Sequence, residues 1–172
     1  MRKKRGDQRG FTLVEMLCAT LILVMLALVT GVGLRLALRS YRAVRAESET
    51  QLLLSTALDA LADDLRYARD VKTKAGPEGP LLDTYRSDSY GQGAALELDS
   101  ENQLLAGGKR VLPPGAYGNG AYQVRELRVL CGQGGFTIHL AVGEGNGDIT
   151  ASTPEEGVFV RCLNRLTEGE AP

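Results

Sequence analysis

The chain has 172 residues, enough for one modest domain and an additional segment. Residues 1–10 hold five of the 20 basic and one of the 21 acidic side chains, a charge of +4, which leaves 15 basic and 20 acidic side chains, or −5, for the remainder. That acidic remainder argues against general nucleic-acid binding. One histidine and three cysteines without a Cys-x-x-Cys pair argue against a zinc site.

An apolar run of 24 residues, Phe11–Leu34, follows the basic leader and contains one formal charge, Glu15. About 20 apolar residues suffice to cross a bilayer, so the run predicts a transmembrane helix. A secretory signal peptide fits less well, because the run is too long and no clean A-x-A site follows it. The basic residues that flank the span, five before and four after, favour a cytoplasmic N-terminus only weakly.

The boundary between leader and apolar run has the sequence Gly-Phe-Thr-Leu-Val-Glu at positions 10–15. With the basic leader, it resembles the class III signal peptide and first helix of type IV pilins and pseudopilins, over residues 1 to about 70. The resemblance implies that a prepilin peptidase cuts between Gly10 and Phe11 and methylates the Phe11 amine. It also implies that the leader stays cytoplasmic and that the rest of the chain is exported.

A carboxylate in an apolar span is costly and usually functional, which singles out Glu15. Cleavage after Gly10 creates an ammonium on Phe11, about one helical turn away. In a helix bundle without water, Glu15 needs a positive partner, and the Phe11 ammonium of a neighbouring subunit is the nearest candidate. The resemblance implies this role, in which the pair sets the axial register of packed helices. The alternative is an incidental polar residue near the headgroups.

Neither glycine nor proline occurs between Leu34 and Ala75, so the helix is expected to continue to residue 73. Apolar residues recur there at spacings of four and three, which predicts a seam that packs against a sheet. The seam consists of Leu54, Leu58, Leu61, Leu65 and Ala68, and the opposite, solvated face carries Asp59, Asp63, Arg66 and Asp70. The Gly- and Pro-rich residues 74–80 are expected to end the helix.

Three arginines, Arg35, Arg39 and Arg42, fall on one helical face just beyond the apolar span. They are candidates for contact with lipid headgroups or with acidic residues of a neighbouring subunit. A belt of side chains that extend back to the membrane interface is an equally good explanation.

Short strands and glycine turns are predicted after Pro80. The expected strands are Ala94–Leu98, Gln103–Leu112, Tyr122–Cys131, Phe136–Val142 and Val158–Leu163. Alternation places one face of each of the last two strands inward, namely Phe136, Ile138, Leu140 and Val142, and Val158, Val160 and Cys162. Together they predict an antiparallel sheet on the helix seam, an α+β fold with a long N-terminal helix, as in pilins. Alternation places Cys131 and Cys162 inward, and we hypothesise a disulfide between them; two buried thiols on nearby strands are the alternative.

No catalytic constellation is present: the single histidine, His139, lies on a predicted strand, so neither an enzyme nor a cofactor is expected. Glu144, Asn146 and Asp148 alternate with glycine and faintly resemble a calcium loop. The loop lacks the downstream bidentate glutamate at the expected spacing. A flexible hairpin loop is therefore the better interpretation.

The resemblance divides the chain into a cleaved leader (1–10), a transmembrane and filament-core helix (11–34), the soluble half of the long helix (35–73) and a β-rich head (74–172). It implies a structural subunit, a minor pilin or pseudopilin, that serves pilus assembly, type II secretion or DNA uptake. The implied partners are the prepilin peptidase, other pilin subunits, an inner-membrane assembly platform and membrane lipid, with no direct nucleic-acid contact. The implied location is the cell membrane, with an extracytoplasmic head, and then an extracellular or periplasmic filament.

A monomeric, single-pass membrane-anchored binding protein is the alternative function. It predicts no cleavage after Gly10 and tolerance of Glu15→Ala. The residues alone leave open whether the subunit is a major pilin, a minor pilin, or a secretion or competence pseudopilin.

Overall fold

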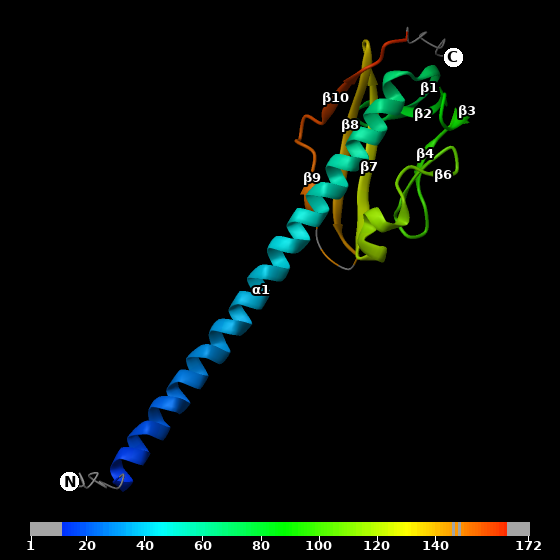
Figure 1. The fold of residues 1–172 in the computed structure, drawn as a ribbon. Coiled ribbons are helices and arrows are strands. Elements are labelled where there is room, and N and C mark those ends of the chain that lie inside the picture. The colour runs from blue at the N-terminus through cyan, green and yellow to red at the C-terminus, as the bar shows by residue number, and fades with distance from the viewer. Residues whose placement is uncertain (1–11, 146, 148, 165–172) are drawn as a thin grey trace, which may run out of the picture. The chain divides into compact units, whose positions relative to one another are not determined.

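The computed structural model describes residues 12–145, 147 and 149–164. The chain forms two compact units, Met1–Val44 and Arg45–Pro172. The helix α1, Leu13–Arg66, supplies the described fold of the first unit and continues into the second (Figure 1).

The first unit is an apolar helix whose side chains are exposed along its whole described length. The large apolar side chains between Leu13 and Val44 are 48–77% exposed. The hydroxyls of Thr20 and Thr30 donate to the carbonyls of Leu17 and Leu26, at 2.9 and 2.5 Å, so these polar groups are satisfied within the helix. Among the described helices, α1 is long and apolar enough to span a membrane, as the sequence predicts.

In the second unit, residues 45–66 of α1 pack against a sheet. The buried positions on this part of the helix are Thr50, Leu53, Ala57, Leu61 and Leu65. Leu61, Leu65 and Ala68 are buried as predicted, whereas Leu54 and Leu58 are only partly buried. In the first part of this segment, the helix face that contacts the sheet is therefore shifted by about one residue from the predicted seam, to Leu53 and Ala57. The predicted solvated face is exposed throughout.

The main sheet has the order β1-β2-β7-β8-β10, with β3 on β2 and β9 on β8, and all its pairs are antiparallel (Figure 1). Its strands are β1 (Arg69–Gly76), β2 (Gly79–Ser87), β3 (Gly91–Ala94), β7 (Tyr122–Gly132), β8 (Gly135–Glu144), β9 (Ile149–Ser152) and β10 (Val158–Arg161). A small second sheet contains β4 (Leu96–Leu98), β5 (Leu104–Ala106) and β6 (Lys109–Arg110). The 3₁₀ segment η1, Pro114–Gly120, precedes β7.

The core lies between α1 and the inner face of the main sheet. On β8, Phe136, Ile138, Leu140 and Val142 are all buried, which confirms the predicted alternation. A bulge in β7 between Val124 and Glu126 shifts the register there, so Tyr122 and Val124 are buried as well as Val129.

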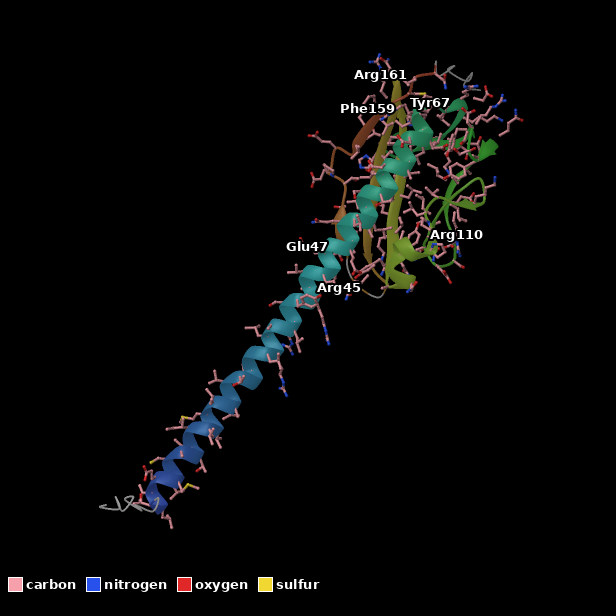
Figure 2. All side chains as sticks on the ribbon, in the orientation of Figure 1. Arg45, Glu47, Tyr67, Arg110, Phe159 and Arg161 are labelled. Atoms are coloured by element: carbon pink, nitrogen blue, oxygen red, sulfur yellow. The ribbon has the colours of Figure 1, made fainter. Side chains whose placement is uncertain are left out.

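The strand β10 also alternates as predicted: Val160 is buried, while Phe159 is 59% exposed and Arg161 is exposed (Figure 2). The Phe159 ring lies over Gly135 of β8, because a Cβ built on Gly135 would lie 2.8 Å from the ring. That Cβ would also lie 2.2 Å from the Val160 carbonyl oxygen. Only glycine fits this position, where two strands approach closely.

The prediction of a helix through residue 73 is wrong, because α1 ends at Arg66 and residues 69–76 form β1. The Gly- and Pro-rich segment is the turn of the β1–β2 hairpin, where Gly76 pairs with Gly79. The end of α1 is fixed from far along the chain. Leu163 N–H donates to the Arg66 carbonyl at 2.8 Å, and the Asn164 side-chain amide donates to the Tyr67 carbonyl at 2.7 Å. These donors satisfy the carbonyls of the last helical residue and of the residue after it, which a further helical turn would otherwise use.

Candidate functional site

The first turn of α1 presents the single carboxylate of the apolar span, Glu15. Thr12 caps this turn: its Oγ1 accepts from Glu15 N–H at 3.3 Å, and its carbonyl accepts from Met16 N–H at 3.2 Å. Thr12-x-x-Glu15 is the sequence pattern of a capping box. The unpaired amides of this turn also favour a negative charge close by. The start of the helix and the position of its carboxylate are therefore set by the same four residues.

Glu15 is exposed on a helix whose neighbouring side chains are apolar and equally exposed. If a second helix packs against this apolar surface, the carboxylate is buried, and an unpaired buried charge costs about 3–5 kcal/mol. Such packing is therefore favourable at Glu15 when the second helix places a positive charge beside it. Gly10 and Phe11, the predicted cleavage and methylation residues, lie outside the described residues. Thr12 belongs to the motif found in the sequence, but sequence reasoning missed its role as the helix cap, although the Thr-x-x-Glu spacing is a recognisable signal for it.

Comparison with known protein families gives one match at this end of the chain. The prokaryotic N-terminal methylation motif matches residues 1–31. The chain therefore carries the N-terminal methylation motif of type IV pilins and pseudopilins. The motif implies processing by a prepilin peptidase and assembly with pilin subunits, and it belongs to structural, non-enzymatic proteins. Together with the exposed apolar helix, it indicates a membrane-anchored pilin with an extracytoplasmic head.

The match covers the N-terminal motif and not the head. Neither the curated proteins nor the solved structures give a match to this pilin-like chain. For residues 45–164, the pilin-like character therefore rests on the architecture itself, a helix packed on an antiparallel sheet.

The head of the pilin-like protein does not contain the disulfide expected between Cys131 and Cys162, because both are free thiols. Cys131 of β7 lies opposite Phe136 of β8, and Phe136 lies opposite Val160 of β10. One strand thus separates the two cysteine-bearing segments, a distance of about 9–10 Å, whereas a disulfide needs Cα atoms within about 7 Å. The two thiols share the inner face as predicted, but the strand order keeps them apart.

The thiols are inert for structural reasons. Burial raises the pKa of Cys131 to about 11. The Cys162 Sγ donates to the Ala68 carbonyl at 3.5 Å, next to the end of α1. The Cys131 thiol therefore stays protonated at neutral pH, and both thiols pack as small apolar side chains.

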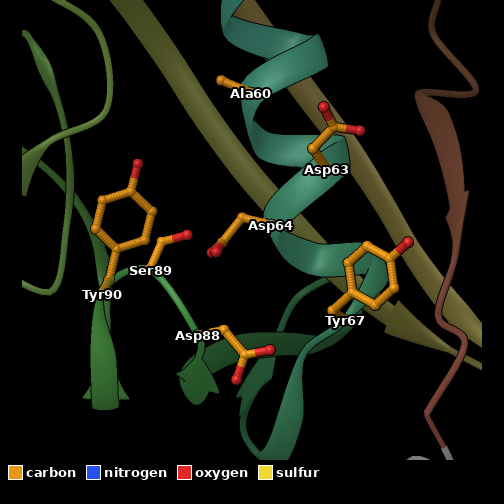
Figure 3. Close-up of a pocket in the computed structure, with 7 residues that line it drawn as sticks. All are labelled: Ala60, Asp63, Asp64, Tyr67, Asp88, Ser89 and Tyr90. Carbon is orange, nitrogen blue, oxygen red and sulfur yellow. The ribbon is translucent and has the colours of Figure 1, made fainter.

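A cleft of about 180 Å³ lies on the head where the last turns of α1 meet the β2–β3 turn (Figure 3). Its lining residues are Ala60, Asp63, Asp64, Tyr67, Asp88, Ser89 and Tyr90. Asp64 is committed to the fold, because its two carboxylate oxygens accept from the Tyr85 hydroxyl and the Ser87 hydroxyl, each at 2.5 Å. Among the described residues, no group of three His, Cys, Asp or Glu side chains is arranged to hold a metal ion.

The Tyr85 and Ser87 hydroxyls come from β2, so the Asp64 carboxylate joins the helix to the sheet. Both donors are buried, with 1% and 4% of the residue exposed. Burial and the bond to Asp64 hold the pKa of Tyr85 above its ordinary value. The cleft thus lies on the outer side of a structural network.

The loop that resembles a calcium site is organised by an arginine. The Arg125 guanidinium donates to the carbonyls of Glu144, Gly145 and Gly147, the last two at 2.7 and 3.3 Å. The side chain therefore supplies positive charge where backbone oxygens converge, the place that a cation would take. Asn146 and Asp148, the other predicted oxygen ligands, lie outside the described residues.

A second link between helix and sheet lies at the start of the head. Arg45 pairs with Glu49 at 2.7 Å on α1, and Tyr122 at the start of β7 donates a hydrogen bond to Glu49. The Tyr122 hydroxyl, and then Arg45, hold the pKa of Glu49 below its ordinary value. The carboxylate thus ties α1 to the first residue of β7.

Proposed function

We propose that this protein is a structural subunit, a minor pilin or pseudopilin, of a type IV pilus-like filament. A prepilin peptidase cleaves it after Gly10 and methylates Phe11, and the mature chain polymerises through α1. The observation that carries the proposal is the methylation motif at the N-terminal end of a helix whose apolar side chains are exposed and whose apolar span contains one carboxylate, Glu15.

The physical sequence of events follows from the helix. In the membrane, lipid covers the exposed apolar side chains of residues 13–34. The backbone polar groups of this segment are hydrogen-bonded within the helix, as a lipid environment requires. An ATP-driven platform in the inner membrane moves the subunit out of the lipid. Other copies of the helix then replace lipid around the apolar surface. Water does not reach the bundle, so Glu15 pairs with the Phe11 ammonium of the next copy and sets the axial register.

The head remains outside the helix bundle. Its antiparallel sheet and the second half of α1 form a core of their own, independent of the apolar span. Such a filament serves pilus assembly, protein secretion by the type II pathway or DNA uptake. No residue set in the described head supports a catalytic role.

The experiment that tests the proposal is the intact mass and N-terminal sequence of the protein from its own membrane fraction. The expected chain begins at Phe11 and carries one additional methyl group on its amine. A chain that still begins at Met1, in cells with an active prepilin peptidase, contradicts the proposal and supports the membrane-anchored monomer instead.

The role of Glu15 is tested with Glu15→Ala and a matched control, Glu47→Ala. Glu47 is an exposed carboxylate of the same helix beyond the apolar span. We expect Glu15→Ala to be processed normally but to yield at least tenfold less filament, and Glu47→Ala to assemble. Equal assembly of both variants would rule out the register role of Glu15.

A further inference from the structure

The part of α1 just beyond the apolar span has two unlike faces. Arg35, Arg39 and Arg42 are spaced by four and three residues, which places them on one side of the helix. The apolar residues Tyr41 and Val44 lie outside this basic side. All three arginines are exposed, and no ion pair joins them to a carboxylate in the described part of the chain. We call Arg35, Arg39 and Arg42 the arginine face.

The length of the span decides what can cover this face. At about 1.5 Å per residue, Phe11–Leu34 is about 36 Å long, which already exceeds the hydrocarbon core of about 30 Å. Arg35 therefore lies in the headgroup layer, at the side opposite the leader. Arg42 lies seven residues further, about 10 Å beyond Arg35 and outside a bilayer of about 40–45 Å. Lipid phosphate accounts for Arg35 but not for the whole face.

The charge of the chain points to the remaining partner. Residues 45–172 contain 12 basic and 19 acidic side chains, a balance of −7, whereas residues 11–44 contain the three arginines and Glu15, a balance of +2. Each copy thus carries a basic helix face and an acidic head. A contact between unlike surfaces of successive copies repeats without closing, and such contacts generate helical filaments.

We propose that, in the filament, the arginine face binds the acidic head surface of a second copy of this chain. The proposal rests on the proposed function, because it requires that the chain polymerises. It adds to the Glu15 contact a second, electrostatic contact outside the membrane. The attraction offsets the repulsion between heads of like charge and is weakened by salt, since exposed charges are screened over about 8 Å at physiological ionic strength.

Crosslinking in assembled filaments tests the contact directly. A photoreactive amino acid replaces Arg42 in one variant and Val44 in the control, in cells with the natural assembly machinery. Val44 lies about 170° around the helix from the centre of the arginine face, at about 100° per residue. We expect the probe at position 42 to capture peptides from residues 45–164 of a second copy, and the probe at position 44 to capture none of them. Capture of lipid alone at position 42 would overturn the proposal.

Charge variants provide a second readout that does not depend on the probe. We expect Arg39→Glu with Arg42→Glu to reduce filament yield at least tenfold, with cleavage after Gly10 and membrane insertion unchanged. The lysine variants at both positions should assemble. The control is Arg110→Glu with Arg161→Glu, an equal charge change at exposed positions of β6 and β10. Normal assembly of the double glutamate variant contradicts the arginine-face contact, whereas failure of the unmodified, processed chain to polymerise contradicts the proposed function itself.

Discussion

Removal of the Asp64 carboxylate tests whether one buried network joins the helix to the sheet of the head. In Asp64→Ala, the Tyr85 and Ser87 hydroxyls lose their acceptor while they remain buried. A buried polar group without a partner costs about 1–3 kcal/mol, so the two together cost roughly 2–6 kcal/mol. For a domain of this size, the midpoint of thermal unfolding should fall by roughly 10–20 °C.

The assay is thermal unfolding of the full-length protein in detergent micelles, followed by the near-UV circular dichroism of its six tyrosines. Asp63→Ala is the matched control, because Asp63 is exposed and its contact with Arg66 is a surface ion pair of 3.9 Å. Such pairs contribute at most about 1 kcal/mol. Equal midpoints for the Asp64 and Asp63 variants would refute the structural role assigned to the network.

The same network predicts that the stability of the folded head decreases at alkaline pH. The folded state raises the pKa of Tyr85 above its value of about 10 in the unfolded chain, so it favours the neutral phenol. The resulting stability is fully present below pH 10 and is lost as the pH rises above it. We expect Tyr85→Phe to reduce the loss of stability between pH 9 and pH 11, measured by the same unfolding assay. An unchanged slope in this variant would contradict the assignment.

Three further predictions concern the rest of the head. The pKa of Glu49 is lowered in the folded state, so the carboxylate stabilises the fold above pH 4.5, and this stability is lost as the pH falls through the folded-state pKa. In Glu49→Gln, the midpoint of thermal unfolding should therefore decrease less below pH 4.5 than in the unmodified protein. Leu61→Ala should lower the free energy of unfolding, measured by urea titration, by about 2–5 kcal/mol, because Leu61 is 1% exposed. The control Leu52→Ala, at a position that is 67% exposed, should change the same free energy by less than about 0.5 kcal/mol. Cys131 and Cys162 should both react with an alkylating agent after unfolding without reductant, and a mass for a bridged pair would disprove the strand order.

Local patterns in the sequence were sufficient for the parts of the fold that depend on few neighbours. The apolar run, the long helix and the alternation of Phe136 to Val142 on β8 are visible because each is a repeat within one element. The Glu15 position was equally visible, as one charge in an apolar span. Its cap, Thr12, was open to the same kind of reasoning through the Thr-x-x-Glu spacing.

Contacts between distant segments explain the misses. At the end of the helix, Leu163 binds the Arg66 carbonyl and Asn164 binds the carbonyl of the next residue, Tyr67. These partners lie almost 100 positions later in the chain, and no local signal predicts them. Alternation gave the correct face for Cys131 and Cys162, but pairing also depends on the order of strands, which places β8 between them. Strand order is a property of the whole sheet and has no signature in either cysteine's neighbourhood.

The hydrogen bonds from Leu163 and Asn164 to the end of α1 also constrain when the head can fold during synthesis. Leu163 and Asn164 are synthesised almost 100 residues after Arg66 and Tyr67, and until then the Arg66 and Tyr67 carbonyls lack these donors. The strand β10 is equally late, so residues 135–138 of β8, with which it pairs, lack this neighbour until then. Folding of the head therefore waits for the C-terminal segment, and a ribosome-stalled chain that ends before β10 should remain sensitive to protease. Affinity tags fused after residue 164 leave this closure intact, whereas truncation before it removes the final step of folding.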